Sequence, residues 1–442
     1  MSPRRSAPPP SPDSSPRTSA PRLERRQVES LSYGAHGIVR SEGKVYFVRN
    51  TAPGDEIDLV VREQHRSYAF AEMTALHVAG PARRTPPCTY LPRCGGCPWQ
   101  HVAYADQLAA KQRAVADSLR RIGHIDAEVS PILGAREEYG YRRRLSLRVE
   151  GGRVGYFAAA SHELVPVSHC LLSAPALDDV IPVADKWCAV LETTVKRLEI
   201  AAVGKENRVV FAAQAEGDFA DRDGATSAAF LRDHPRVQGI VLRGRKWRRQ
   251  WGEDTLEVAL PGGERIGLHA GSFLQVNEAG NERMADIVLD FAHCTPEDRV
   301  LDLYAGYGNL TFPLARRVRE VIAVERDPAS ADGEAHARRL GYAGVTFVRD
   351  DVPSFLESYL RLGRGVEVAV LDPPRNGAAD TARALLRLGP RRIVYVSCNP
   401  STLARDLQIL AGRYRIGRIQ PIDFFPQTYH VETVAELWLT DP

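Results

Sequence analysis

The segment Arg299-Val300-Leu301-Asp302-Leu303-Tyr304-Ala305-Gly306-Tyr307-Gly308 joins a short apolar run to a glycine-rich turn. Further apolar runs follow at 320–325, 345–348, 366–371 and 392–396, and helical segments separate most of them. Strands that alternate with helices predict a doubly wound, Rossmann-like α/β domain with a parallel sheet. Ligands of such a sheet bind beyond the carboxyl ends of its strands. The functional residues are therefore expected where these runs end.

The ends of the first three runs favour S-adenosylmethionine as the ligand. Gly306 and Gly308 let the backbone turn tightly and approach a ligand closely. Glu325 ends the second run, roughly twenty residues further on, where an acidic side chain can bind ribose hydroxyls. Asp351 follows the third run and is expected to contact the adenine. Because one glycine of the dinucleotide fingerprint is missing and there is no P-loop lysine, S-adenosylmethionine fits better than a dinucleotide or ATP.

Two reactive side chains follow the later runs. Asp372 comes after a run that ends at Leu371, and Cys398 comes after 392–396, so a carboxylate and a thiol are expected at one edge of the sheet. A thiolate can add to carbon 6 of a uracil and so activate carbon 5 for methylation. Glu432 can then remove the proton from carbon 5. The alternative is that Cys398 is a small core residue and Glu432 a surface acid.

The cysteines predict a metal site in the first half of the chain. Seven cysteines in a cytoplasmic protein are more often metal ligands or catalytic groups than disulfides. Cys88, Cys94 and Cys97 lie close together, with glycines between the last two, and Cys170 is the next cysteine along the chain. Thiolates suit an iron–sulfur cluster or zinc, and the spacing leaves both open. Two cysteines with apolar neighbours are expected to fill the core, namely Cys188 and Cys294.

The composition of the chain changes along its length and predicts four regions. Residues 1–26 form a disordered tail rich in Pro, Ser and Arg. Residues 27–80 contain short strands separated by turns, which predicts a small, OB-like antiparallel β-barrel. Residues 81–278 form an α+β domain that carries the cysteines, with helices expected at 104–122 and 178–198. Residues 279–442 form the α/β domain.

Aromatic and basic residues in the first two folded regions suggest a nucleic-acid partner. One face of the barrel can bind single-stranded nucleic acid through Tyr46, Phe47, Arg49, Arg66 and Tyr68. The alternative is that these aromatic residues form the core of the barrel.

Charge and hydropathy narrow the class of protein further. The net charge is only +3, yet basic clusters occur at Arg142–Arg144 and Arg243–Arg249 and suit a polyanion. No apolar stretch approaches the roughly 18 residues of a membrane span, and the N-terminus lacks a secretory signal. We expect a cytoplasmic monomer that binds a polyanion and has no obligate protein partner.

Together these motifs resemble the RNA 5-methyluridine (uracil-5-) methyltransferases, in particular the iron–sulfur branch with an N-terminal TRAM domain. The resemblance covers about residues 27–440. It rests on the TRAM-like segments 31–39, 45–48 and 53–55, on Cys94-Gly95-Gly96-Cys97-Pro98-Trp99-Gln100-His101, on Phe273-Leu274-Gln275-Val276-Asn277, on Asp372-Pro373-Pro374-Arg375, on Ser397-Cys398-Asn399-Pro400 and on the segment from Phe425 to Glu432.

The resemblance implies a class I methyltransferase domain that moves the methyl group of S-adenosylmethionine to carbon 5 of a uridine in RNA. Ribosomal RNA is the implied substrate, transfer RNA is the alternative, and a non-catalytic iron–sulfur RNA-binding protein is a different class of function. Cys398 is the implied nucleophile and Glu432 the implied general base. The implied cofactor contacts are Gln275, Tyr304, Gly306, Asn309, Glu325, Asp351 and Asp372. The implied ligands of a 4Fe-4S cluster are Cys88, Cys94, Cys97 and Cys170.

Three positions carry specific expectations. Tyr304 stands where phenylalanine is common in the family, and Asp351 stands where asparagine is expected. Phe273 is expected either to stack on an extruded base or to be a buried structural aromatic.

Overall fold

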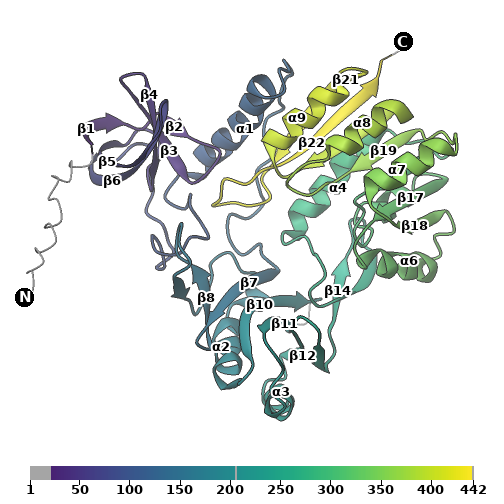
Figure 1. Cartoon of the computed structure of the whole chain (residues 1–442), viewed down its shortest axis with the longest axis horizontal. Helices are drawn as coiled ribbons and strands as arrows, with labels where there is room; N and C mark the ends of the chain where they lie inside the picture. The colour runs from purple at the N-terminus through teal and green to yellow at the C-terminus, as the bar shows by residue number, and fades with distance from the viewer. Residues whose placement is uncertain (1–20, 205–206, 441–442) are drawn as a thin grey trace, which may run out of the picture. The chain divides into compact units, whose positions relative to one another are not determined.

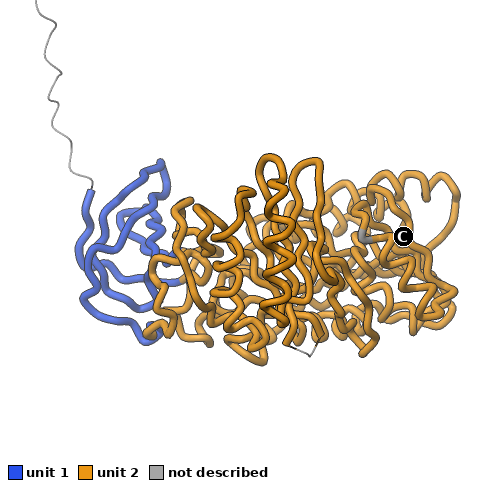
Figure 2. Tube along the Cα trace, turned by 90° about the horizontal axis from the view of Figure 1, so that it is seen from below, with its two compact units in different colours: residues 1–30, 36–83 blue, residues 31–35, 84–442 orange. Residues whose placement is uncertain are grey.

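The computed structural model describes residues 21–204 and 207–440, which form two compact units (Figure 2). Unit 1 contains residues 21–30 and 36–83, and unit 2 contains residues 31–35 and 84–440. Residues 1–20 of the predicted tail lie outside the described residues. Residues 22–26, which the sequence assigned to the tail, instead belong to strand β1, because this strand pairs with β5 from Arg22↔Val60 to Gln27↔Glu56.

Unit 1 is built on a six-stranded sheet with the order β1-β5-β6-β4-β3-β2. Its alternating apolar residues point to one side and form a small core that includes Val39, Val48 and Leu59. The strands are β1 (Arg22–Gln27), β2 (Ser30–Leu31), β3 (His36–Ser41), β4 (Lys44–Arg49), β5 (Glu56–Gln64) and β6 (Tyr68–Val78). Strands β4 and β6 pair in parallel, whereas β1 with β5, β5 with β6 and β3 with β4 pair antiparallel.

The first sheet of unit 2 has seven strands in the order β13-β12-β11-β10-β7-β8-β9. Helices α2 (Val180–Val190) and α3 (Arg222–Asp233) pack on it through Trp187 and Phe230. The strands are β7 (Arg144–Glu150), β8 (Arg153–Phe157), β9 (Leu164–Pro166), β10 (Thr194–Val203), β11 (Arg208–Glu216), β12 (Val237–Arg243) and β13 (Arg248–Gly252). A short hairpin follows, formed by β14 (Thr255–Ala259) and β15 (Arg265–His269).

The expected helix at 178–198 is wrong in its second half. The helix α2 ends at Val190, and residues from Thr194 onward form β10, which lies between β7 and β11. Consecutive β-branched residues at Thr193, Thr194 and Val195 favour the extended backbone, and burial between two strands adds to that preference.

The second sheet of unit 2 has the order β18-β17-β16-β19-β20-β22-β21, and its first five strands are parallel (Figure 1). The strands are β16 (Arg299–Leu303), β17 (Glu320–Glu325), β18 (Val345–Arg349), β19 (Val368–Leu371), β20 (Arg392–Ser397), β21 (Tyr414–Ile422) and β22 (Glu432–Leu439). The parallel strands therefore lie close to where the sequence predicted them. Because β22 runs antiparallel to β20, its first residue, Glu432, lies at the edge where β20 ends.

Helices cover both faces of this sheet. They are α4 (Glu278–Ala292), α5 (Thr311–Ala315), α6 (Ala329–Leu340), α7 (Val352–Arg361), α8 (Ala379–Leu388) and α9 (Pro400–Leu410). Helix α1 (Tyr104–Arg121) precedes the first sheet in the chain, yet its Val115 and Leu119 pack in the same core as Leu403 and Leu407 of α9. Within the described residues, no helix is long and apolar enough to cross a membrane.

Candidate active site

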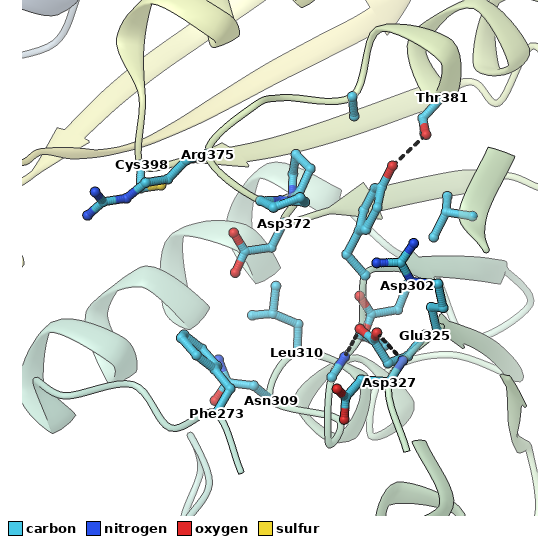
Figure 3. Close-up of a pocket in the computed structure, with 18 of the residues that line it drawn as sticks. Phe273, Asp302, Asn309, Leu310, Glu325, Asp327, Asp372, Arg375, Thr381 and Cys398 are labelled. Carbon is cyan, nitrogen blue, oxygen red and sulfur yellow. Dashed lines mark hydrogen bonds between the residues drawn. The ribbon is translucent and has the colours of Figure 1, made fainter. Parts of the chain in front are cut away.

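A cavity of about 880 Å³ opens at the carboxyl ends of the parallel strands (Figure 3). The structure places every predicted cofactor contact and both predicted reactive residues on its wall: Gln275, Tyr304, Gly306, Asn309, Glu325, Asp351, Asp372, Cys398 and Glu432. They come from the ends of the five parallel strands, from the start of β22 and from the loop before α4. The sequence thus predicted which residues meet, although their chemical roles stay predictions.

The turn after β16 is shaped for close contact with a ligand. Gly306 has a φ of +57°, and nothing lies within 4 Å of the place where a Cβ would project. Its N–H donates to Oε2 of Glu325 at 3.0 Å, while the N–H of Asp327 donates to Oε1 at 2.7 Å. Both carboxylate oxygens are therefore fixed by backbone donors, and their remaining lone pairs are free to accept from hydroxyl groups.

Tyr304 and Asn309 are held by partners that the sequence did not reveal. Tyr304 has a φ of +67°, which is unusual for a residue with a side chain, and its hydroxyl lies 2.7 Å from Oγ1 of Thr381. The amide of Asn309 exchanges two hydrogen bonds of 2.8 Å with the amide of Asn281 on α4. Side-chain amides have no recognisable spacing when they pair across the fold, so Asn281 carried no sequence signal.

Asp351 lines the cavity just after β18. It is the residue before α7, where the backbone changes from extended to helical, and its Oδ1 lies 4.0 Å from Nη1 of the exposed Arg326. The expected contact with the adenine stays a prediction.

Two carboxyl groups on the cavity wall, the buried Asp302 and the half-buried Asp372, have raised pKa values. Burial raises the pKa of Asp302 to about 7, although the hydroxyl of Thr311 donates to its Oδ2 at 2.5 Å. Burial alone raises the pKa of Asp372 to about 6. In the view of Figure 3, Asp372 points into the space between Cys398 and Glu325. A cationic ligand in this space favours the ionised carboxylates.

Cys398 follows β20 and is half-buried, so it is neither a core residue nor a freely exposed one. Burial raises the pKa of its thiol to about 11; the charges of Glu432 and Asp372 add to this increase, while Arg375 opposes it through its charge and a hydrogen bond. Figure 3 shows Arg375 beside Cys398. The backbone carbonyl of Arg375 accepts from Nδ2 of Asn399 at 3.0 Å, which ties the two loops together.

Glu432 is buried, and its carboxyl has a pKa raised well above the ordinary value because burial and the charge of Asp372 outweigh the effect of Arg375. The alternative that Glu432 is a surface acid is therefore wrong. Tyr33, which unit 2 includes despite its early position, donates from its hydroxyl to the backbone carbonyl of Cys398 at 3.2 Å. No sequence feature indicated that Tyr33 contacts Cys398.

A buried polar network fixes the loop before Glu432. Gln427 is fully buried with a φ of +70°, and its Oε1 accepts from Nη2 of Arg84 at 2.7 Å and from Nε2 of Gln107 at 3.0 Å. Its backbone N–H donates to Oε1 of Gln107 at 2.9 Å, and its carbonyl accepts from the N–H of Trp99 at 3.0 Å. The buried ammonium of Lys111 donates to Asp423 at 2.6 Å at the start of the same loop. The loop is thus clamped from α1 and from the segment that follows Cys97.

Phe273 lines the mouth of the cavity and is 64% exposed, so the alternative of a buried structural aromatic is wrong. Its loop is held because Nη1 of Arg144 donates to the carbonyl of Ser272 at 2.8 Å.

The four predicted metal ligands approach one another in space. The pKa of Cys94 is raised by burial and by the neighbouring thiols of Cys170 and Cys88, and that of Cys97 is raised to about 12 by burial, Cys170 and Cys94. Backbone pairing between Cys94 and Ala158 holds the segment against the end of β8. Among the residues that the structure describes, no group of three or more His, Cys, Asp or Glu side chains is arranged to bind a metal ion.

Comparison with solved structures supports the class of the fold. The tRNA (uracil-54, C5)-methyltransferase of Pyrococcus abyssi, in complex with S-adenosyl-L-homocysteine, superimposes with a TM-score of 0.72. The match covers 93% of this chain and all of that one, at 23% sequence identity. The strand order and the cavity at the strand ends thus define the α/β fold of an S-adenosylmethionine-dependent methyltransferase with an additional N-terminal β-rich region.

Sequence comparison shows the family. The model of the tRNA (Uracil-5-)-methyltransferase family matches residues 226–337 and 359–440. An uncharacterized RNA methyltransferase of Listeria innocua is 30% identical over 93% of this chain and 96% of its own. The 23S rRNA (uracil(1939)-C(5))-methyltransferase RlmD of Pseudomonas aeruginosa is 35% identical over 93% of each chain, and that of Aeromonas hydrophila is 33% identical over 92% of this chain and 94% of its own. The chain belongs to the RNA uracil-C5-methyltransferase family of S-adenosylmethionine-dependent enzymes.

Proposed function

We propose that this enzyme methylates carbon 5 of a specific uridine in ribosomal RNA through a covalent bond between Cys398 and the uracil. The observation that carries the proposal is that Cys398, Asp372 and Glu432 open onto the same cavity as the predicted cofactor contacts. Relatives named for the methylation of 23S rRNA are 33–35% identical to this chain, whereas the tRNA enzyme of similar coverage is 23% identical, which favours ribosomal RNA over transfer RNA.

The residues that line the cavity suit S-adenosylmethionine as a ligand. Glu325 presents a pre-oriented carboxylate to the ribose hydroxyls, and Gly306 leaves open space beside its backbone. Asp302 and Asp372 favour a positively charged ligand. When bound, the sulfonium of S-adenosylmethionine supplies an electrophilic methyl group. Gln275 and Asp351 line the same cavity and are proposed to position the two ends of the cofactor.

Cys398 starts the reaction on the base. Its thiolate forms a bond to carbon 6 of the uracil, and the electron pair of the 5,6 double bond moves into an enolate that makes carbon 5 nucleophilic. Carbon 5 takes the methyl group, and S-adenosylhomocysteine leaves. Glu432 then accepts the proton from carbon 5, the 5,6 double bond forms again, and the thiolate of Cys398 is expelled. Atoms and electrons balance without an oxidant or reductant.

The charged residues around Cys398 shift the pKa values of Cys398 and Glu432. Arg375 is the cation that lowers the thiol pKa, and it opposes the effects of burial and of two carboxyl groups. Burial raises the pKa of the Glu432 carboxyl well above its ordinary value. A positively charged ligand beside it stabilises the carboxylate and opposes this increase, which favours the form that accepts a proton.

The target uridine has to leave its stack before Cys398 and the methyl donor can approach carbon 6 and carbon 5. The exposed ring of Phe273 at the cavity mouth is placed to stack on the extruded base. Asp372 is proposed to orient that base by a hydrogen bond, since its carboxylate lies in the same space.

We also propose that Cys88, Cys94, Cys97 and Cys170 hold a 4Fe-4S cluster. Each iron of such a cluster binds a single thiolate, so the four sulfurs surround the cluster and do not converge on one ion as they do around zinc. The mutual effects of the thiols on their pKa values support a shared site. A bound cluster would join the four cysteines through four covalent iron–thiolate bonds. Methyl transfer requires no redox step.

Unit 1 is proposed to be the TRAM domain that first binds the RNA. Phe47, Tyr68 and Phe70 form a connected set of partly exposed rings, with ring centroids 5.5 to 6.0 Å apart. His65 stacks on Tyr68 at 4.3 Å. Tyr46, by contrast, is buried in the core of this unit. We propose that the enzyme works as a cytoplasmic monomer.

The decisive experiment is methyl transfer to RNA from a strain in which the gene is deleted. Purified enzyme and isotope-labelled S-adenosylmethionine are expected to produce 5-methyluridine at one position of ribosomal RNA. The Cys398→Ala variant should bind this RNA and transfer no methyl group. The control variant Cys294→Ala, at a half-buried cysteine that does not line the cavity, should keep full activity. Label only in transfer RNA would establish the alternative substrate, and activity of Cys398→Ala would refute the covalent mechanism.

A further inference from the structure

The turn between β12 and β13 carries a dense set of positive charges at the edge of the first sheet. β13 is the outermost strand, and the turn closes where the N–H of Gly244 donates to the carbonyl of Trp247 at 3.0 Å. We name residues 243–249 the basic arm.

Three aromatic rings make the basic arm rigid. Phe219 contacts Trp247 and Trp251 with ring centroids 5.4 and 6.0 Å apart, and Nε1 of Trp247 donates to the carbonyl of Gly217 at 3.0 Å. These rings pack against the core of the sheet, so they support the arm and are not its recognition surface. Because the arm is held rigidly, its cations can bind a ligand without a large loss of conformational entropy.

The cations of the basic arm are largely unneutralised. Arg243, Arg245, Lys246 and Arg249 are exposed, and none of them forms an ion pair with a residue that the structure describes. Only Arg248 has a carboxylate partner, Asp254, at 2.5 Å. Cations clustered in this way repel one another and attract a polyanion.

The basic arm reaches the wall of the active-site cavity. A Cβ placed on Gly271 would lie 3.6 Å from Nη1 of Arg243. Gly271 and Phe273 both line that cavity. In the antiparallel register, Arg243 is opposite Arg248, so both side chains point to the same side of the hairpin. The charges thus run from the turn, at Arg245 and Lys246, to the mouth of the cavity.

We propose that the basic arm binds the phosphate backbone of the RNA strand next to the target uridine. This inference rests on the proposed function, because it assigns a path to the RNA outside the cavity. An extruded nucleotide at Phe273 leaves its neighbouring phosphates at the cavity mouth, where Arg243 lies. Arg245 and Lys246 continue the contact along the strand. Because the arm touches phosphates alone, it adds affinity and not sequence specificity.

The test is RNA binding as a function of salt, with a transcript of the RNA that the wild-type enzyme methylates. The variant Arg243→Gln/Arg245→Gln/Lys246→Gln removes three cations. Since each phosphate contact on single strands contributes about 0.7 to the slope of log K against log salt, the slope should decrease by about 2. The KM for RNA should rise on the order of tenfold or more at moderate salt, whereas kcat at saturating RNA and the affinity for S-adenosylmethionine should be unchanged.

The matched control is Arg361→Gln/Arg364→Gln/Arg387→Gln, which removes three exposed cations at the ends of α7 and α8. Helices that follow parallel strands end at the opposite edge of the sheet from the cavity, so this variant should bind RNA like the wild type. An unchanged salt slope in the arm variant, or an equal decrease in both variants, would overturn the proposal. Equal loss of binding to polyglutamate would show a general anion surface and also overturn it. If the wild-type enzyme methylated no RNA, the proposed function itself would have failed.

Discussion

Cys398 lies in an environment that disfavours the thiolate form of its side chain. Burial and two neighbouring carboxyl groups raise its pKa to about 11, so only a small fraction of the free enzyme carries a thiolate at neutral pH. A resting thiol is protected from oxidation and from unspecific alkylation, because the thiolate is the reactive form. Arg375 opposes this increase in the pKa of Cys398. Only the folded chain shows that Arg375 lies next to Cys398.

We predict that Arg375→Gln raises the pKa of Cys398 further, because it removes the cation that stabilises the thiolate. Alkylation of Cys398 by iodoacetamide in the free enzyme should speed up with pH, without a plateau below about pH 10. In Arg375→Gln this profile should move to higher pH by about one unit, which is a roughly tenfold slower reaction at pH 8. Arg375→Lys retains the charge and should lie between the two. An unchanged profile in Arg375→Gln would contradict the role of this cation.

We predict that Glu432→Gln traps a methylated protein–RNA adduct. Glutamine has the size of glutamate but cannot accept the proton from carbon 5, so the bond between Cys398 and the base persists. The adduct should survive denaturing electrophoresis and carry labelled methyl groups. The double variant Cys398→Ala/Glu432→Gln should give none. A Glu432→Gln enzyme that turns over normally would mean that another group is the base.

At the scale of elements, the loop from Asp423 to Glu432 depends on contacts from distant parts of the chain. Gln427 has a left-handed backbone that side chains rarely adopt, which costs about 1–2 kcal/mol. Its six hydrogen bonds to Arg84, Trp99, Gln107 and Glu138 offset that strain. The loop is therefore held in place before Glu432, and we propose that Gln427 positions this residue.

We predict that Gln427→Gly lowers kcat and destabilises the fold by about 1–3 kcal/mol. Glycine accepts the left-handed backbone, so the loss comes from the orphaned amide of buried Gln107 and from the lost hydrogen bonds to half-buried Arg84 and Glu138. The free energy of unfolding in urea measures the stability, and single-turnover kinetics measure the loss of proton removal. As a control, Glu42→Gly replaces an exposed residue with a φ of +51° and should change neither quantity by more than about 0.5 kcal/mol. Wild-type kinetics in Gln427→Gly would show that the network is dispensable for the base.

On the scale of the whole molecule, the cysteine-rich segment and the catalytic sheet are mechanically connected. The backbone of Trp99, two residues after Cys97, donates to Gln427, and Nε1 of Trp99 donates to the carbonyl of Gly34 at 3.0 Å. A cluster bound by the four cysteines would fix this segment and, through it, the loop that carries the base. The cluster would then contribute to catalysis without any change of redox state.

We predict that Cys94→Ser loses the iron and weakens the loop. The anaerobically purified wild-type protein should contain about four irons per chain and a broad visible absorbance of an iron–sulfur cluster. Cys94→Ser should lose both and unfold at a lower temperature, because the cross-links are gone. Cys294→Ser, at a cysteine outside the cluster, should keep the iron. Zinc in place of iron in the wild type would decide the alternative in favour of a structural zinc site.

The sequence by itself determined the features that depend on local patterns. Alternating apolar runs gave the parallel strands within a few residues, because buried strands and amphipathic helices have distinct periods. Strand ends placed Glu325, Asp372 and Cys398 on one edge, since the parallel topology leaves no other arrangement. Residues 178–198 show the limit of this reasoning, because pairing with two neighbouring strands turned the second half of an expected helix into β10.

Only the tertiary structure decided which distant groups complete the site. Tyr33, Arg84, Gln107 and Asn281 are far in sequence from the residues they hold, and a single polar side chain has no periodicity that reveals its partner. The depth of burial, and with it the raised pKa of Cys398 and Glu432, follows from how the loops close over the sheet. Local sequence motifs thus identified the candidate reactive residues. Packing set the pKa values of these residues, because desolvation depends on all of their neighbours at once.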